Sequence, residues 1–152
     1  MHSEKQHVNS SFFLKTDQLF ITKQQLTMRF ISTKLHGVID YLSGVLFIAS
    51  PWLFHFNEIE NASWVMIIIG LMIILLSALT DYEGGLIRKV AMSTHLTMDL
   101  IAGLFLAASP WLLGFADQVY LPHLILGIFE MGAGLFTSRH AFEHNIHKPG
   151  LN

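Results

Sequence analysis

Four long stretches of mainly apolar residues alternate with short polar segments along this chain. A helix needs roughly 20 mostly apolar residues to cross a hydrocarbon core about 30 Å thick. Backbone groups in lipid must find their hydrogen bonds within the segment, so closely spaced stretches of this length predict a bundle of transmembrane α-helices. We therefore expect an all-α membrane protein whose four spans, paired as two tandem helical hairpins, lie at about 35–56, 62–80, 90–115 and 120–138.

The composition agrees with the membrane class. Of the 152 residues, 52% are hydrophobic and 13% are charged, whereas soluble domains carry about 25% charged residues. A single domain of this size exposes too much surface to hide so much apolar material from water. The formal net charge of −2 argues against a nucleic-acid partner. The absence of cysteine excludes disulfides, thiolate metal sites and cysteine nucleophiles.

The basic residues predict how the spans are oriented. All nine lie in the N-terminal segment, in the loop between the second and third spans, or in the C-terminal tail. The other two loops have no basic residue and carry Glu58, Glu60 and Asp117. Loops that hold Lys and Arg stay in the cytoplasm. We therefore expect a multi-pass protein of the plasma membrane with both termini in the cytoplasm.

The sequence also contains an internal repeat. The segments 36–56 and 95–115 align without a gap at an offset of 59, and nine of the 21 positions are identical. Each copy holds an even number of spans, so the two copies share one orientation and are expected to be related by a pseudo-twofold axis along the membrane normal. The identical pairs include His36/His95, Asp40/Asp99, Gly44/Gly103, Ser50/Ser109, Pro51/Pro110 and Trp52/Trp111.

The paired Ser-Pro-Trp motifs, with His-Gly-Val-Ile-Asp-Tyr before the first and Leu-Thr-Asp-Tyr-Glu between them, carry a family resemblance. The chain resembles the SPW-repeat family of small bacterial and archaeal integral membrane proteins over about residues 28–137. Members often begin at a point that matches Met28. The first 27 residues are therefore expected to be an appended tail or the result of a mis-assigned start codon. The family has no established activity, so the resemblance implies an architecture and leaves the function open.

These boundaries predict five parts. They are a polar cytoplasmic tail (1–30), a first repeat (31–80), a cytoplasmic loop (81–89), a second repeat (90–138) and a cytoplasmic tail (139–152). Within each repeat we expect the Ser-Pro-Trp motif to be structural, with Pro51 and Pro110 kinking or ending their helices. At about 1.5 Å per residue Trp52 lies roughly 24 Å beyond His36, near the interface where tryptophan anchors.

A stripe of polar and small residues marks one face of three spans. Positions that recur at helical spacing share a face, and an acid on such a face belongs in the bundle interior, where glycines allow close helix approach. The expected interior polar cluster is His36, Asp40, His95, Asp99 and Glu130, and the expected packing glycines are Gly44, Gly103, Gly127 and Gly134.

The role of this cluster has three interpretations. It forms a structural clasp between the hairpins, or a proton or cation path that uses the three acids and the histidines, or His36 and His95 ligate a haem. Glu130 is either a protonated acid hydrogen-bonded to a neighbouring helix or part of a transport path. The tail histidines His140, His144 and His147 have metal-compatible spacing but are expected to be solvated.

No enzyme motif is present: the chain has no phosphate-binding loop, nucleophile elbow or His-Glu-x-x-His. We expect no catalytic residue, no metal and no cofactor. The function expected first is a structural or accessory membrane component whose partners are the lipid bilayer and either a second copy or another membrane protein. A small proton or cation transporter is the alternative, and a haem-binding membrane protein is the second alternative.

Overall fold

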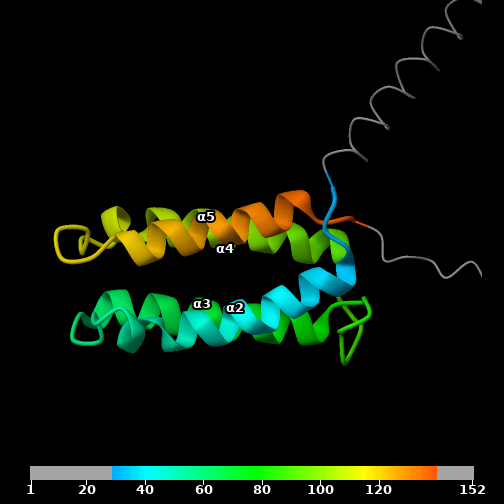
Figure 1. Cartoon of the computed structure of the whole chain (residues 1–152), viewed down its shortest axis with the longest axis horizontal. Coiled ribbons are helices and arrows are strands. Elements are labelled where there is room, and N and C mark those ends of the chain that lie inside the picture. The colour runs from blue at the N-terminus through cyan, green and yellow to red at the C-terminus, as the bar shows by residue number, and fades with distance from the viewer. Residues whose placement is uncertain (1–28, 140–152) are drawn as a thin grey trace, which may run out of the picture. The chain divides into compact units, whose positions relative to one another are not determined.

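The computed structural model describes residues 29–139. The chain divides into two units, residues 1–30 and 31–152, and the helices described below belong to the second. Most of the expected N-terminal tail and the tail histidines lie outside the described residues. The described part is all-α and has no named strand, which confirms the all-α class (Figure 1). Its helices are α2 (Thr33–Leu53), α3 (Glu60–Leu79), α4 (Met92–Leu112) and α5 (Leu121–Phe136).

The helices pack as two pairs, α2 with α3 and α4 with α5 (Figure 1). Glycines permit the close approach inside each pair. A Cβ atom added at Gly70 would lie 2.6 Å from the carbonyl oxygen of Gly44, and one added at Gly127 would lie 2.6 Å from the carbonyl oxygen of Gly103. Backbone therefore meets backbone at equivalent points of both hairpins, where no side chain fits between the helices.

The four helix ends at 33, 79, 92 and 136 lie at one end of the bundle. Ile31 pairs with Thr137, and Thr80 pairs with Val90, each as an isolated bridge. The side chain of Ser32 caps α2 by accepting a hydrogen bond from the amide of Leu35 at 3.2 Å. The hairpin turns, 54–59 and 113–120, lie at the opposite end of Figure 1.

The Ser-Pro-Trp motifs lie in the last turn of α2 and of α4. Pro51 has no amide hydrogen, so the carbonyl of Phe47, four residues earlier, loses its helical donor. The hydroxyl of Ser50 donates to that carbonyl at 2.7 Å, and Ser109 donates to Leu106 at the same distance. The serine therefore replaces the hydrogen bond that the proline removes, which explains physically why the two residues are adjacent.

The two prolines, Pro51 and Pro110, do not themselves end their helices. Both are buried inside the helix, and α2 and α4 each continue for two residues beyond them. Their carbonyls accept from the amides of Phe56 and Phe115, five residues later, at 2.8 and 2.9 Å. This bond is typical of a Schellman C-cap, which needs a left-handed residue just past the helix. Of the two expected effects, kinking or ending the helix, the second does not occur at the proline itself, because the C-cap ends each helix two residues later.

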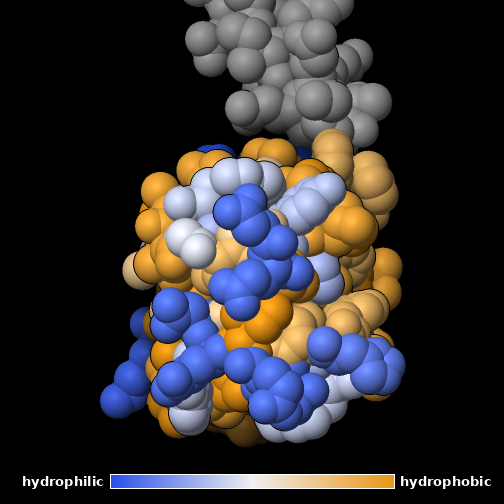
Figure 2. All heavy atoms as spheres, turned by 90° about the vertical axis from the view of Figure 1, so that its left-hand side faces the viewer, coloured by the Kyte–Doolittle hydropathy of each residue, from blue (hydrophilic) through white to orange (hydrophobic). Residues whose placement is uncertain are grey.

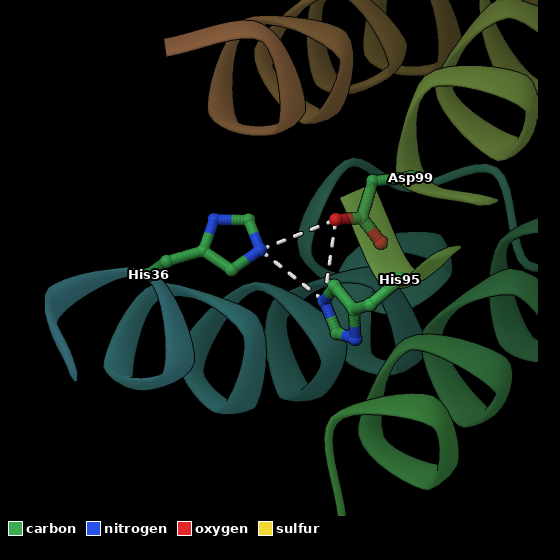
Figure 3. Close-up of side chains that lie close together, drawn as sticks. All are labelled: His36, His95 and Asp99. Atoms are coloured by element: carbon green, nitrogen blue, oxygen red, sulfur yellow. Dashed lines mark hydrogen bonds and ion pairs between the residues drawn. The ribbon is translucent and has the colours of Figure 1, made fainter. Parts of the chain in front are cut away.

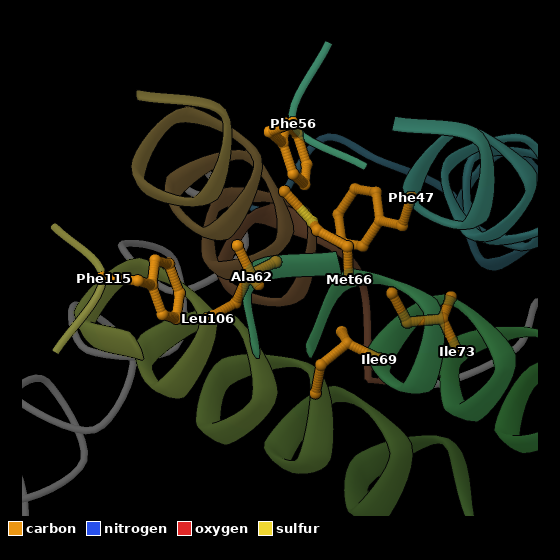
Figure 4. Packing of buried hydrophobic residues seen from close by; sticks show 8 residues of the cluster. All are labelled: Phe47, Phe56, Ala62, Met66, Ile69, Ile73, Leu106 and Phe115. Atoms are coloured by element: carbon orange, nitrogen blue, oxygen red, sulfur yellow. The ribbon is translucent and has the colours of Figure 1, made fainter. Parts of the chain in front are cut away.

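Apolar packing fills the part of the bundle nearer the hairpin turns. Phe47 and Met66 are fully buried there, and the rest of the cluster is Phe56, Ala62, Ile69, Ile73, Leu106 and Phe115 (Figure 4). The outside of the helices is also apolar. Leu42, Leu75, Leu104 and Ile125, one from each helix, are 60–68% exposed. In the end-on view from the hairpin turns, hydrophilic residues gather on the end face and hydrophobic residues surround them (Figure 2).

Two of the four expected spans, α3 and α4, are long and apolar enough to cross a membrane by length and composition. The other two differ for separate reasons. α2 has 21 residues but includes Lys34, His36 and Asp40. α5 has 16 residues, so it rises about 24 Å, short of a hydrocarbon core of about 30 Å.

Candidate functional site

Two histidines and two aspartates from α2 and α4 meet inside the bundle. His36 and His95 are fully buried, Asp40 is 1% exposed and Asp99 is 2% exposed. On each helix the histidine and the aspartate lie on adjacent turns, because the aspartate follows the histidine by four residues. The structure therefore brings four of the five residues of the expected polar cluster into one contact network that joins the two hairpins.

Three ligand-type atoms form a nearly equilateral triangle in this network (Figure 3). The Nε2 atoms of His36 and His95 are 3.2 Å apart, and the Oδ2 atom of Asp99 is 3.2 Å from each of them. Asp40 completes the group, since Oδ1 lies 3.3 Å from Nε2 of His36 and Oδ2 lies 3.0 Å from Nε2 of His95. Both carboxylates therefore touch both histidines.

The other ring nitrogen of each histidine is held by a threonine at a helix end. Nδ1 of His36 is 2.9 Å from the hydroxyl of Thr137, and Nδ1 of His95 is 2.8 Å from that of Thr80. Each hydroxyl donates its single proton to a helix carbonyl four residues earlier, at 2.6 and 2.7 Å. The threonine oxygens must therefore accept from Nδ1–H, which leaves both Nε2 atoms directed at the carboxylates.

A chain of hydroxyls supports Asp40 from α3 and the following loop. Ser77 donates to Oδ2 of Asp40 at 3.0 Å, and Tyr82 contacts the hydroxyl of Ser77. Because Ser77 has already used its proton, Tyr82 donates to it. Burial raises the pKa of Tyr82, which lies outside the helices, to about 12, so this phenol stays protonated. At the position equivalent to Ser77, the second hairpin has Gly134, where an added Cβ would lie 3.3 Å from Cβ of Asp99.

Glu130, the fifth residue of the expected cluster, is 1% exposed, yet neither of its carboxyl oxygens has a hydrogen-bond partner. The expectation of an acid hydrogen-bonded to a neighbouring helix is therefore wrong. No donor on a neighbouring helix reaches either oxygen among the described residues.

The haem interpretation does not fit the two histidines. The two axial ligands of a haem lie on opposite faces of the macrocycle. Their ligating nitrogens are about 4 Å apart, because each bond to iron is about 2 Å. The Nε2 atoms are only 3.2 Å apart, and Asp99 contacts both. No room is left for a porphyrin between them, because the two imidazoles touch one another directly.

Both Ser-Pro-Trp tryptophans face outward: Trp52 is 59% exposed and Trp111 is 56% exposed. The serine and proline of each motif, by contrast, are buried: Ser50 and Pro51 on α2, and Ser109 and Pro110 on α4. The motif thus divides between the interior and the outer surface, and none of its side chains has a hydrogen bond to the His–Asp network among the described residues.

His123, near the hairpin-turn end of α5, is fully buried, whereas His55, the other histidine at this end, is exposed in the first hairpin turn. Nε2 of His123 donates to the carbonyl of Ala62 on α3 at 3.0 Å, and its ring packs on Phe56 and Phe115. His123 is thus a further polar contact between the hairpins.

Sequence reasoning missed the residues that support the cluster. Thr80 and Thr137 align when the second helices of the two repeats are matched at an offset of 57, and that identity was the available signal for their shared role. Ser77 and Tyr82 have no counterpart in the second hairpin, so repetition could not single them out.

The comparisons with known proteins are consistent with this architecture. The family model described as the SPW repeat domain matches residues 34–137, from the first turn of α2 to the threonine that follows α5. No curated protein and no solved structure matches the chain. The resemblance inferred from the paired Ser-Pro-Trp motifs is therefore confirmed.

Proposed function

The chain belongs to the SPW-repeat family, and from this premise we propose that it is a four-span integral membrane protein with a structural or accessory role. In this proposal the two hairpins are related by a pseudo-twofold axis along the membrane normal. The buried His–Asp cluster acts as a clasp between them. The observation that carries the proposal is that the polar contacts of this cluster join hairpins whose outer surfaces are apolar.

The distribution of polarity supports the membrane assignment. Ionisable side chains such as His36, Asp99 and Glu130 are buried, while large apolar side chains are exposed on all four helices. Monomeric soluble proteins rarely expose extended apolar surface. A lipid environment stabilises both features, since it solvates the apolar exterior and makes exposure of an acid costly.

The ends of the bundle differ in charge as the proposed orientation requires. Lys34, Arg88 and Lys89 are exposed at the end that holds the helix ends near Thr33 and Leu79, whereas Glu58 and Asp117 are exposed in the hairpin turns. Basic loops remain cytoplasmic. The end with the basic residues is therefore proposed to lie on the cytoplasmic side of a bacterial inner membrane.

Single-cysteine labelling tests the four spans and the orientation directly, since the chain has no cysteine of its own. Variants Glu58→Cys and Asp117→Cys should react with a membrane-impermeant maleimide in intact cells. Lys89→Cys and Arg139→Cys should react only after permeabilisation. Labelling of Lys89→Cys in intact cells would overturn the orientation, and different accessibility of Glu58→Cys and Asp117→Cys would overturn the four-span topology.

The clasp is tested by a charge-removing variant of nearly unchanged shape. Removing one partner of a buried ion pair costs about 3–5 kcal/mol, so Asp99→Asn should lower the free energy of unfolding by about that amount. The matched control Asp117→Asn changes an exposed acid and should cost less than about 0.5 kcal/mol. Unfolding by SDS titration in mixed micelles, followed by circular dichroism, measures both. Equal stability of the two variants would contradict the clasp.

A proton- or cation-conducting role is the second candidate, and Glu130 is the observation that favours it. Its carboxyl group is buried with both oxygens lacking hydrogen-bond partners, and intramembrane acids often serve transport. Purified protein in liposomes should then dissipate a proton or cation gradient, and Glu130→Gln should abolish the flux. If the role is structural, the gradient should decay at the same rate with wild type, with Glu130→Gln and in empty liposomes.

A further inference from the structure

We propose that the His36–Asp40–His95–Asp99 cluster is a structural binding site for one divalent transition-metal ion, with Zn²⁺ as the best-fitting ion. The inference uses the same residues as the proposed clasp and specifies what occupies its centre. It rests on three observations: the distances between the ligand atoms, the hydrogen atoms that the threonines place on the rings, and the unpartnered oxygen of Asp40.

The distances match a tetrahedral coordination shell. Zn–N and Zn–O bonds of about 2.0 Å set the ligand atoms of a tetrahedron about 3.3 Å apart. The three separations among Nε2 of His36, Nε2 of His95 and Oδ2 of Asp99 are all 3.2 Å. These atoms therefore form one face of such a tetrahedron, and the ion would lie just outside their plane.

Asp40 would supply the fourth ligand. It lies outside the group of three residues whose ligand atoms are all within 4.8 Å of one another, so its carboxylate would have to turn toward the ion. Asp40 is 1% exposed, and its Oδ1 has no hydrogen-bond partner although it lies 3.3 Å from Nε2 of His36. A buried carboxylate oxygen left without a donor is costly. Coordination to the ion would satisfy Oδ1, while Oδ2 keeps the hydrogen bond from Ser77.

The protons on the histidine rings favour a metal over an ion-pair network. Thr137 and Thr80 accept from Nδ1–H, so each neutral imidazole offers the lone pair of Nε2 to the centre. Histidines that bind metals almost always donate their other N–H to such a partner. If both rings instead carried a proton on Nε2, two N–H donors would face one another across 3.2 Å.

A divalent ion also satisfies the charge balance of the cluster. One divalent cation neutralises the two aspartates while both histidines remain neutral, so the buried cluster carries no net charge. A single shared proton would leave one uncompensated negative charge in an apolar interior, which is strongly unfavourable. Two imidazoles and two carboxylates without an open position make a closed site of the structural type, and imidazole nitrogen in tetrahedral geometry suits zinc.

The test uses the full chain, purified without a polyhistidine tag and carrying alanine at the three tail histidines, His140, His144 and His147. The protein in detergent is equilibrated with Zn²⁺ and desalted, and its metal content is measured by mass spectrometry. A competing chromophoric chelator gives the dissociation constant. We expect one Zn²⁺ per chain. Replacement by Co²⁺ should give the intense visible bands of a tetrahedral site, and X-ray absorption should show two imidazole ligands.

Variants then locate the ion. Asp99→Asn should weaken binding by more than about 100-fold, and Thr137→Val, which removes only the support of His36, should weaken it by about 10–100-fold. His55→Gly is the matched control, because His55 is exposed in the hairpin turn, and it should bind like the parent. Circular dichroism checks that each variant is folded.

Several results would overturn the site. They are a parent protein that desalts free of metal, a cobalt complex without tetrahedral bands, and unchanged affinity in Asp99→Asn. The measurements on the parent protein do not depend on any variant folding. They are also separate from the proposed function, because a chain that binds zinc here but labels with a different topology would overturn the membrane proposal alone.

Discussion

The closest helix contact in the second hairpin lends itself to a steric test. Gly127 on α5 faces the backbone of α4, and a Cβ atom added there would lie 2.5 Å from the amide nitrogen of Ala107 and 2.6 Å from the carbonyl oxygen of Gly103. Ordinary contacts begin at about 3.4 Å, so in Gly127→Ala the two backbones must move apart by about 0.9 Å (3.4 minus 2.5). Both obstacles are backbone atoms, so no side-chain rotation can relieve the clash.

The expected cost follows from the packing that this separation removes. A gap of 0.5–1 Å forfeits a quarter to a half of the dispersion energy of the atoms involved, and overpacking typically costs about 1–3 kcal/mol. We expect Gly127→Ala to lower the free energy of unfolding by about 2–3 kcal/mol, toward the upper end because the strain falls on backbone.

The matched control lies five residues further along α5. An added Cβ at Gly132 meets nothing within 4 Å, so Gly132→Ala should stabilise the helix by about 0.5–1 kcal/mol through propensity alone. SDS titration in mixed micelles, read by circular dichroism, measures both variants. If Gly127→Ala were as stable as Gly132→Ala, the two backbones could not be as close as the structure places them.

Three further predictions concern single side chains. Ser50→Ala should cost about 1–3 kcal/mol, because it leaves the buried carbonyl of Phe47 without a donor; unfolding titration checks this, and an unchanged midpoint would contradict the role assigned to the serine. His55, at φ 57°, occupies the position that Gly114 occupies at φ 73° in the second hairpin, so His55→Gly should stabilise the protein by about 0.5–1 kcal/mol in the same assay, and a loss of stability would refute the strain. Tyr82 has a pKa raised to about 12, against about 10 when unfolded. The unfolded chain therefore releases the phenol proton first, and the stability from this burial is lost as the pH rises from about 10 to 12. The ultraviolet difference spectrum between wild type and Tyr82→Phe should gain phenolate absorbance only near pH 12, and its appearance near pH 10 in folded protein would contradict the burial.

Much of the architecture was readable from the sequence because long apolar helices follow simple rules of length and hydropathy. The four helices lie within a few residues of the expected stretches, and the repeat offset of 59 recurs in the bounds of α2 and α4. Helix ends were less predictable. They depend on local capping, such as that by Ser32 or the C-caps that follow Pro51 and Pro110, and on the short length of α5, which windowed hydropathy does not resolve.

The composition of the cluster was also accessible, because His36 and Asp40 recur as His95 and Asp99 and an acid on a helix face belongs inside a bundle. Its geometry was not. Whether two histidines sandwich a large cofactor or touch one another depends on the distance between α2 and α4. That distance follows from packing among all four helices.

The sequence by itself determined the class, the pairing of helices and the identity of the polar residues, since these follow from periodicity and repetition along one chain. Only the tertiary structure decided how those residues are used. It placed Thr80 and Thr137 on the outer nitrogens of the two rings and brought the inner nitrogens within 3.2 Å of each other. It also left Glu130 without a hydrogen-bond partner. Such contacts join residues up to 101 positions apart, and no local pattern encodes a distance between atoms that only packing brings together.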